Sequence, residues 1–263
     1  MLCKTRIASA AAPWVGDRLH DEPHQGAIVH AGAHALYFTS RGDVLGIAAA
    51  TAVPVPLALR TQLPDLRELP GGLPQTGERV RIGAGAVDLG GAAVHVARYL
   101  DYRMPPLPRG EAHTLVRRLD ALRQPASELP RALLTALTAR PAEEAHRLLG
   151  RGSGLTPYGD DGLAGMLAAL LAAGDACAPR LAAVVTRLAP QRTTLLSATL
   201  LRRAAAGEVL PQFARLAAAL ARGTDGEVRG RAATLTAVGH TSGAGMLRGL
   251  HLGLTHITMR SCT

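Results

Sequence analysis

Aromatic residues and lysine are scarce in this 263-residue chain. Only 3% of the residues are aromatic although 48% are hydrophobic, so we expect a core of leucine, alanine and valine, a composition that favours helices. Lys4 is the only lysine, and the formal net charge of +9 therefore comes from arginines scattered along the chain. Because basic clusters and aromatic platforms for stacking bases are both lacking, the sequence predicts no nucleic-acid partner.

Cysteine and long apolar runs are also scarce. Cys3, Cys177 and Cys262 lie far apart and form no C-x-x-C pair, which excludes a disulfide framework and a zinc ribbon. Few cysteines are typical of a reducing compartment, so we predict a cytoplasmic location. The longest apolar run, residues 163–173, is too short to cross a bilayer of about 30 Å, and we expect no membrane partner.

Short alternating segments dominate residues 1–104, for which we predict a mainly β domain, either a small barrel or a sandwich. Residues 1–25 are expected to be a loosely patterned lead-in. Prolines make residues 54–77 irregular, and any extended part of this segment should lie at a sheet edge. The candidate strands are residues 27–30, 35–39, 44–47, 79–82, 86–89 and 92–96.

A stiff, proline-rich connector at residues 103–110 marks the boundary to a second domain, residues 105–263. This domain has helical periodicity throughout, so the predicted fold class is α+β with an all-α C-terminal bundle. The helix at 161–173 is apolar on all sides and belongs at the centre of the bundle. Gly162 and Gly165 within it indicate close approach of another backbone or of a ligand. The other expected helices are residues 111–123, 129–139, 141–150, 179–188, 193–206, 211–221, 228–238 and 242–259.

The stretch from Gly150 to Asp161 joins a glycine loop to the start of the central helix. Gly152 and Gly154 allow backbone conformations with positive φ. The helix begins either at Pro157 after a Thr156 cap or after an Asp160 cap, and the sequence does not choose between them. In both cases free N–H groups and the positive end of the helix dipole face the loop, which suits an anion.

Two adjacent carboxylates complicate this anion site. Asp160 and Asp161 would repel a bare phosphate, so an anion requires a bridging Mg²⁺, a nearby arginine, or carboxylates aimed elsewhere. The structural alternative is a capped helix whose aspartates only satisfy backbone donors.

A second glycine-bearing junction, Gly239-His240-Thr241-Ser242-Gly243, precedes the last helix. Ala164-Gly165-Met166-Leu167 recurs after it as residues 244–247, so we expect the two helix starts to converge on one pocket. His240 is a candidate general acid or base. Thr241, Ser242 and the amides behind them are candidate donors to an oxyanion or carboxylate.

The segment from Gly152 to Asp161 resembles the G-x-G-L-T-P-S-G-D-D motif of the family named for the AllH subunit of oxamate carbamoyltransferase. Residues 239–243, with Met246-Leu247 after them, resemble a second segment of that family. The resemblance implies carbamoyl transfer between a small amide acid and phosphate, by an enzyme assembled from several different subunits. Tyr158 replaces a serine of the family motif, and Gly245 stands where the family usually has an aspartate.

From these motifs we predict an enzyme, or enzyme subunit, of carbamoyl- or carboxyl-transfer type that acts on a small carboxylated amide such as oxamate. Its expected partners are a small anion such as carbamoyl phosphate or oxamate and other subunits of a hetero-oligomer. The alternative, which Gly245 favours, is a non-catalytic module that binds a small anionic metabolite. The predicted catalytic residues are Asp160, Asp161 and His240, with the two aspartates holding Mg²⁺ if a metal is used. The predicted substrate-binding residues are Gly152, Ser153, Gly154, Leu155, Thr156, Pro157, Gly159, Thr241, Ser242 and Gly243.

Overall fold

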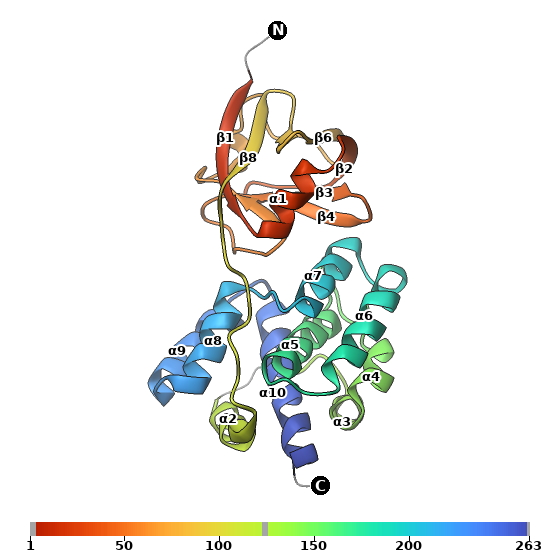
Figure 1. Cartoon of the computed structure of the whole chain (residues 1–263), viewed down its shortest axis with the longest axis vertical. Coiled ribbons are helices and arrows are strands. Elements are labelled where there is room, and N and C mark those ends of the chain that lie inside the picture. Colours follow the sequence, from red (N-terminus) through yellow and green to blue (C-terminus); the bar gives the residue numbers. More distant parts are fainter. Residues whose placement is uncertain (1–3, 123–125, 262–263) are drawn as a thin grey trace. The chain divides into compact units, whose positions relative to one another are not determined.

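The computed structural model describes residues 4–122 and 126–261 of the chain. Two compact units, Met1–Tyr102 and Arg103–Thr263, make up the chain (Figure 1). The predicted α+β fold class is confirmed, since the first unit is mainly β and the second is helical. Cys177 is free and buried, whereas Cys3 and Cys262 lie outside the described residues.

The first unit is a closed β-barrel with the strand order β1-β5-β4-β3-β2-β6-β7-β8. It closes through β1, which runs parallel to β8 and pairs antiparallel with β5 at Ala10 and Arg60. Inward-facing residues such as Phe38, Leu45 and Ile82 form its buried core. The strands are β1 (Thr5–Ala11), β2 (His24–Ala31), β3 (Ala35–Ser40), β4 (Asp43–Ala48), β5 (Ala58–Arg60), β6 (Arg79–Gly83), β7 (Ala86–Asp88) and β8 (Ala92–Tyr99).

Two sequence predictions in this unit are wrong. The expected lead-in at residues 1–25 is not loose, since its described part, residues 4–25, contains β1, helix α1 (Pro13–His20) and the start of β2. The sequence hides β1 because its many small residues give weak alternation, and its pairing partner β8 lies far along the chain. Strand β5 does not lie at an edge but between β1 and β4, because the neighbouring prolines fall outside its three residues.

The second unit is a bundle of helices. A short 3₁₀ turn, Ala145–Arg147, follows α4, so the helix expected at 141–150 is α-helical only in its first turn. Among the described residues, no helix combines the length and apolarity needed to cross a membrane. The α-helices are α2 (Ala112–Asp120), α3 (Arg131–Ala139), α4 (Pro141–Glu144), α5 (Tyr158–Ala172), α6 (Ala178–Arg192), α7 (Leu195–Ala205), α8 (Pro211–Arg222), α9 (Asp225–Thr236) and α10 (Ser242–Ser261), and further 3₁₀ turns lie at Leu66–Glu68 and Arg109–Glu111.

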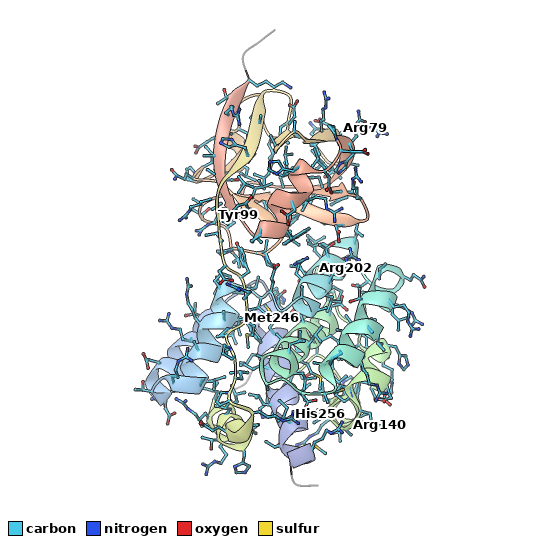
Figure 2. All side chains as sticks on the ribbon, in the orientation of Figure 1. Arg79, Tyr99, Arg140, Arg202, Met246 and His256 are labelled. Carbon is cyan, nitrogen blue, oxygen red and sulfur yellow. The ribbon has the colours of Figure 1, made fainter. Side chains whose placement is uncertain are left out.

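Helix α5 is buried along most of its length and packs against α10 at van der Waals distance between backbones. A Cβ added to Gly165 would lie 2.2 Å from the carbonyl oxygen of Met246, which Figure 2 labels. A Cβ added to Gly249 would lie 2.0 Å from the carbonyl oxygen of Gly162. The predicted close approach of another backbone to α5 is therefore confirmed, and the approaching backbone is that of α10.

The two helices run parallel to each other. Gly245, near the start of α10, contacts Asp161 near the start of α5, and Gly253 contacts Ala169 further along both helices. The N-terminal ends of α5 and α10 therefore lie at the same end of the bundle.

Candidate functional site

The N-terminal ends of α5, α7 and α10 meet around the glycine loop that precedes α5. The Thr156 and Ser242 hydroxyls form a hydrogen bond of 2.8 Å between the loop and the start of α10. The Thr194 hydroxyl, at the start of α7, donates to the carbonyl oxygen of Leu155 at 2.6 Å. Because all three helices begin here, their positive dipole ends act on one small region.

The glycine loop has the strained backbone that the sequence predicts. Gly152 and Gly154 have φ values of 111° and 90°, and Gly150 has a φ of 73°. A Cβ on Gly150 would lie 2.1 Å from the carbonyl oxygen of Arg192, so a side chain is excluded there by contact as well as by conformation. Residues 151–155, which include Ser153, are exposed to solvent.

Neither of the two cap residues expected for α5 caps it. The N-cap position is Pro157, with φ −56° and ψ 143°, and it makes no side-chain cap bond. Thr156 is instead bonded to Ser242, and Asp160 lies inside the first turn. A backbone hydrogen bond takes the place of a side-chain cap, since the N–H of Gly159 in the first turn of α5 donates to the carbonyl oxygen of Arg151 at 2.8 Å.

Asp160 holds the loop against α7. Its side chain accepts hydrogen bonds from the Gly150 N–H at 2.8 Å, from the Ser197 hydroxyl at 2.7 Å and from the Thr193 hydroxyl. Burial raises its pKa, while these three donors act in the opposite direction. Both carboxyl oxygens are occupied by donors of the same chain, so the contacts of Asp160 are those of a positioning residue.

Asp161 is also buried but is differently placed. Only 8% of the residue is exposed, and its Oδ2 is buried with no hydrogen-bond partner among the described residues. Burial raises its pKa to about 8, the hydroxyls of Ser242 and Thr156 oppose the shift, and the Asp160 carboxylate adds to it. Asp161 is therefore mostly protonated at neutral pH, and its carboxyl group can donate a hydrogen bond.

The second predicted junction divides into two parts. Ser242 begins α10 and contacts the glycine loop, Thr241 is half-buried beside it, and Gly243 is packed against the carbonyl oxygen of Leu235, 1.8 Å from where its Cβ would lie. His240 is exposed, and among the described residues no hydrogen bond or ion pair links it to either aspartate. Ser242 therefore contacts the glycine loop that leads to Asp161, whereas His240 makes no described contact with either aspartate.

One departure from the family motif, Gly245, lies beside Asp161, and the other, Tyr158, is the first residue of α5. A Cβ on Gly245 would be 2.8 Å from the Cβ of Asp161 and 3.0 Å from the carbonyl oxygen of Tyr158, so an aspartate has no room at position 245 in this packing. The Tyr158 side chain is buried, with 1% of the residue exposed.

Three hydroxyl residues at the start of α7 are part of this cluster but were not predicted as site residues: Thr193, Thr194 and Ser197. Thr194 caps α7 by accepting from the Ser197 N–H at 3.0 Å. The sequence signal for them is a threonine pair followed by a serine at the third helical position, which is a usual N-cap arrangement.

The aspartate pair does not have the contacts of a free Mg²⁺ site. Mg²⁺ requires ionised oxygen ligands with open lone pairs, whereas Asp160 is bonded by three donors and Asp161 holds a proton at neutral pH. No cluster of three or more His, Cys, Asp or Glu side chains able to hold a metal is found within residues 4–122 and 126–261. Metal use by these residues stays a prediction.

Residues 148–254 match the family model described as oxamate carbamoyltransferase subunit AllH. The match covers less than half of the chain, and it contains both glycine-bearing junctions together with α5, α7 and most of α10. The resemblance on the two motifs is therefore confirmed, and this segment of the chain is AllH-like. Searches of the curated proteins and of the solved structures gave no significant match.

Proposed function

We propose that the AllH-like segment binds a small anionic metabolite at the junction of α5 and α10 and works as an enzyme, or enzyme subunit, of carbamoyl-transfer type. The substrate class that fits is a small carboxylated amide such as oxamate, with carbamoyl phosphate as the phosphorylated counterpart. One observation carries the proposal: parallel helix starts converge on an exposed glycine loop, beside a buried carboxyl group with an unpartnered oxygen.

The electrostatics of this junction favour an anion despite its two aspartates. A protonated Asp161 removes one of the two negative charges that would repel a carboxylate or phosphate. The helix N-termini and the hydroxyls of Thr156 and Ser242 would then supply donors to the ligand oxygens. Asp161 would add a donor to a carbonyl oxygen that becomes negative during acyl transfer.

The remaining residues have supporting parts in this proposal. Asp160 is a positioning residue that keeps the loop on α7. His240 is retained as a candidate acid or base that reaches the site only after a change of side-chain conformation, since it is exposed and without a described contact to the aspartates. Because the matching family is described as a subunit, we expect turnover to require other subunits.

A non-catalytic binding module is the alternative, and Gly245 favours it. The family usually has an aspartate at this place, and the contact of Gly245 with Asp161 leaves no space for one. If that aspartate takes part in the reaction, this chain binds the metabolite without converting it. Turnover assays with and without partner subunits separate the two functions.

Binding is tested by thermal shift with oxamate, carbamoyl phosphate and Mg²⁺ added separately and together. A ligand that binds the folded state raises the melting temperature. We expect Asp161→Ala and Ser242→Ala to remain folded and to lose most of the ligand response, because each removes a hydrogen-bond donor to the ligand. Thr234→Ala is the matched control, because it removes an exposed hydroxyl from α9, outside the site. An undiminished response in both site variants would disprove the location of the site.

A further inference from the structure

The β-barrel contains a pocket that is separate from the α5–α10 junction. It has a volume of about 350 Å³, and its lining comes entirely from the first unit: from β1, Ala50 after β4, the end of β5 with the residues after it, and β8. Two arginines, Arg60 and Arg98, are the only charged residues that line it, beside Ser9, Thr61, Gln62 and four alanines. We call it the arginine pocket.

The pocket forms where the barrel is least regular. Strands β1 and β5 share a single register pair, Ala10 with Arg60, and the pairing of β1 with β8 shifts register between Ser9 and Ala10. A bulge of this kind bends a strand and interrupts its ladder. The alanines on either side are too small to fill the space, so the irregular closure of the barrel leaves a hollow that opens to solvent at Gln62 and Arg98.

The positive charge of the pocket is not neutralised by the protein. One terminal nitrogen of Arg60 donates to the carbonyl oxygen of Ala50 at 2.8 Å, which fixes the guanidinium in place. Its other N–H groups, and the guanidinium of Arg98, have no hydrogen-bond or ion-pair partner in the described part of the chain. Guanidinium groups with free donors are suited to carboxylate and phosphate oxygens.

The neutral side chains define the rest of the ligand. The Ser9 and Thr61 hydroxyls donate to the carbonyl oxygens of His95 and Ala48, at 2.8 and 3.0 Å, so each is held in place and keeps lone pairs for a ligand donor. The alanine surfaces offer a small apolar wall. A cavity of this size is in the usual range for a small metabolite.

We propose that the arginine pocket binds a small metabolite that carries a phosphate or carboxylate group on a short carbon skeleton. Arg98 and Arg60 would hold the anionic group, and the alanines would contact the carbon atoms. This proposal does not depend on the function of the α5–α10 junction.

Isothermal titration of the full chain tests it, with inorganic phosphate, glycerol 3-phosphate and malonate as probes. Loss of a charge-assisted hydrogen bond is expected to weaken binding about tenfold or more, so Arg98→Gln and Arg60→Gln should each raise the Kd by that factor. Arg79→Gln is the matched control, since it removes the same charge from the exposed face of β6 (Figure 2). Tighter binding of glycerol 3-phosphate than of malonate would identify phosphate esters as the ligand class, and the reverse order would identify carboxylates.

The same titrations in the Asp161→Ala variant separate the two sites. We expect the arginine-dependent binding to persist there, since the variant changes only the other unit. Failure of all three probes to bind, or an equal Kd in wild type and both arginine variants, would overturn the proposal. A signal that survives both arginine variants but disappears in Asp161→Ala would contradict the arginine pocket while supporting the proposed function.

Discussion

Replacing Asp161 by asparagine should stabilise the protein at neutral and alkaline pH but not at acid pH. In the folded protein the pKa of Asp161 is raised from 3.8 to about 8, mainly by burial. Below pH 3.8 the carboxyl group is protonated in both the folded and unfolded states. Between that pH and about pH 8 the unfolded chain ionises while the folded protein keeps the proton, so the free energy of unfolding falls as the pH rises.

The size of the effect follows from the two pKa values. One pKa unit corresponds to about 1.36 kcal/mol, so at pH 7 the folded protein loses up to about 4 kcal/mol of stability by keeping Asp161 protonated. Asparagine has the same shape and no charge, and it therefore avoids this loss. We expect Asp161→Asn to exceed the wild type in stability by up to about 4 kcal/mol at pH 7, with the difference vanishing near pH 4.

Urea unfolding followed by far-ultraviolet circular dichroism measures this difference, because the helical signal reports mainly on the second unit, which contains Asp161. Titrations near pH 4, 6 and 8 give the slope with pH. Asp160→Asn is the matched control: its carboxyl oxygens already accept three hydrogen bonds, so an amide there should lower the stability. A difference between Asp161→Asn and wild type that does not change with pH would refute the reasoning.

Two further predictions concern packing and hydrogen bonding in the helical unit. Gly249→Ala should destabilise the protein by about 1–3 kcal/mol or more in thermal unfolding, because its Cβ would lie 2.0 Å from the Gly162 carbonyl oxygen. Gly230→Ala is the control: its Cβ meets nothing within 4 Å, so this variant should stabilise α9 by up to about 1 kcal/mol. Equal effects of the two variants would contradict the close contact of α5 with α10. Asp160→Ala should lower the free energy of unfolding by about 3 kcal/mol or more, since it leaves three donors unpaired; a loss below about 1 kcal/mol in urea unfolding would show that Asp160 does not hold the loop.

The sequence predicts the barrel strands better than their closure. Strands β3 and β6 alternate buried residues with more exposed ones, which is a local signal. Strand β1 has none, because its identity depends on pairing with β8, where Thr5 lies opposite Ala92. Closure of the barrel is therefore a long-range property, and it could not be derived from the local pattern that reveals the other strands.

The candidate site likewise has some features that local sequence patterns predict and others that depend on contacts between distant segments. The positive φ values of Gly152 and Gly154, and the start of α10 near Ser242, follow from local rules and agree with the structure. The hydrogen bonds from Thr193 and Ser197 to Asp160 join segments more than 30 residues apart. No local pattern shows that the two aspartates differ, since their difference lies in which donors the folded chain brings to each.

The glycines of α10 account for the chemical state of Asp161. Gly245 and Gly249 let α10 approach the backbone of α5 closely, and this approach removes water from the carboxyl group of Asp161, which raises its pKa. The replacement of a family aspartate by Gly245 and the protonation of Asp161 are thus linked through one helix contact. A chain with an aspartate at position 245 would need a wider separation of the two helices, so the departure changes the packing around Asp161 and not only the number of side chains there.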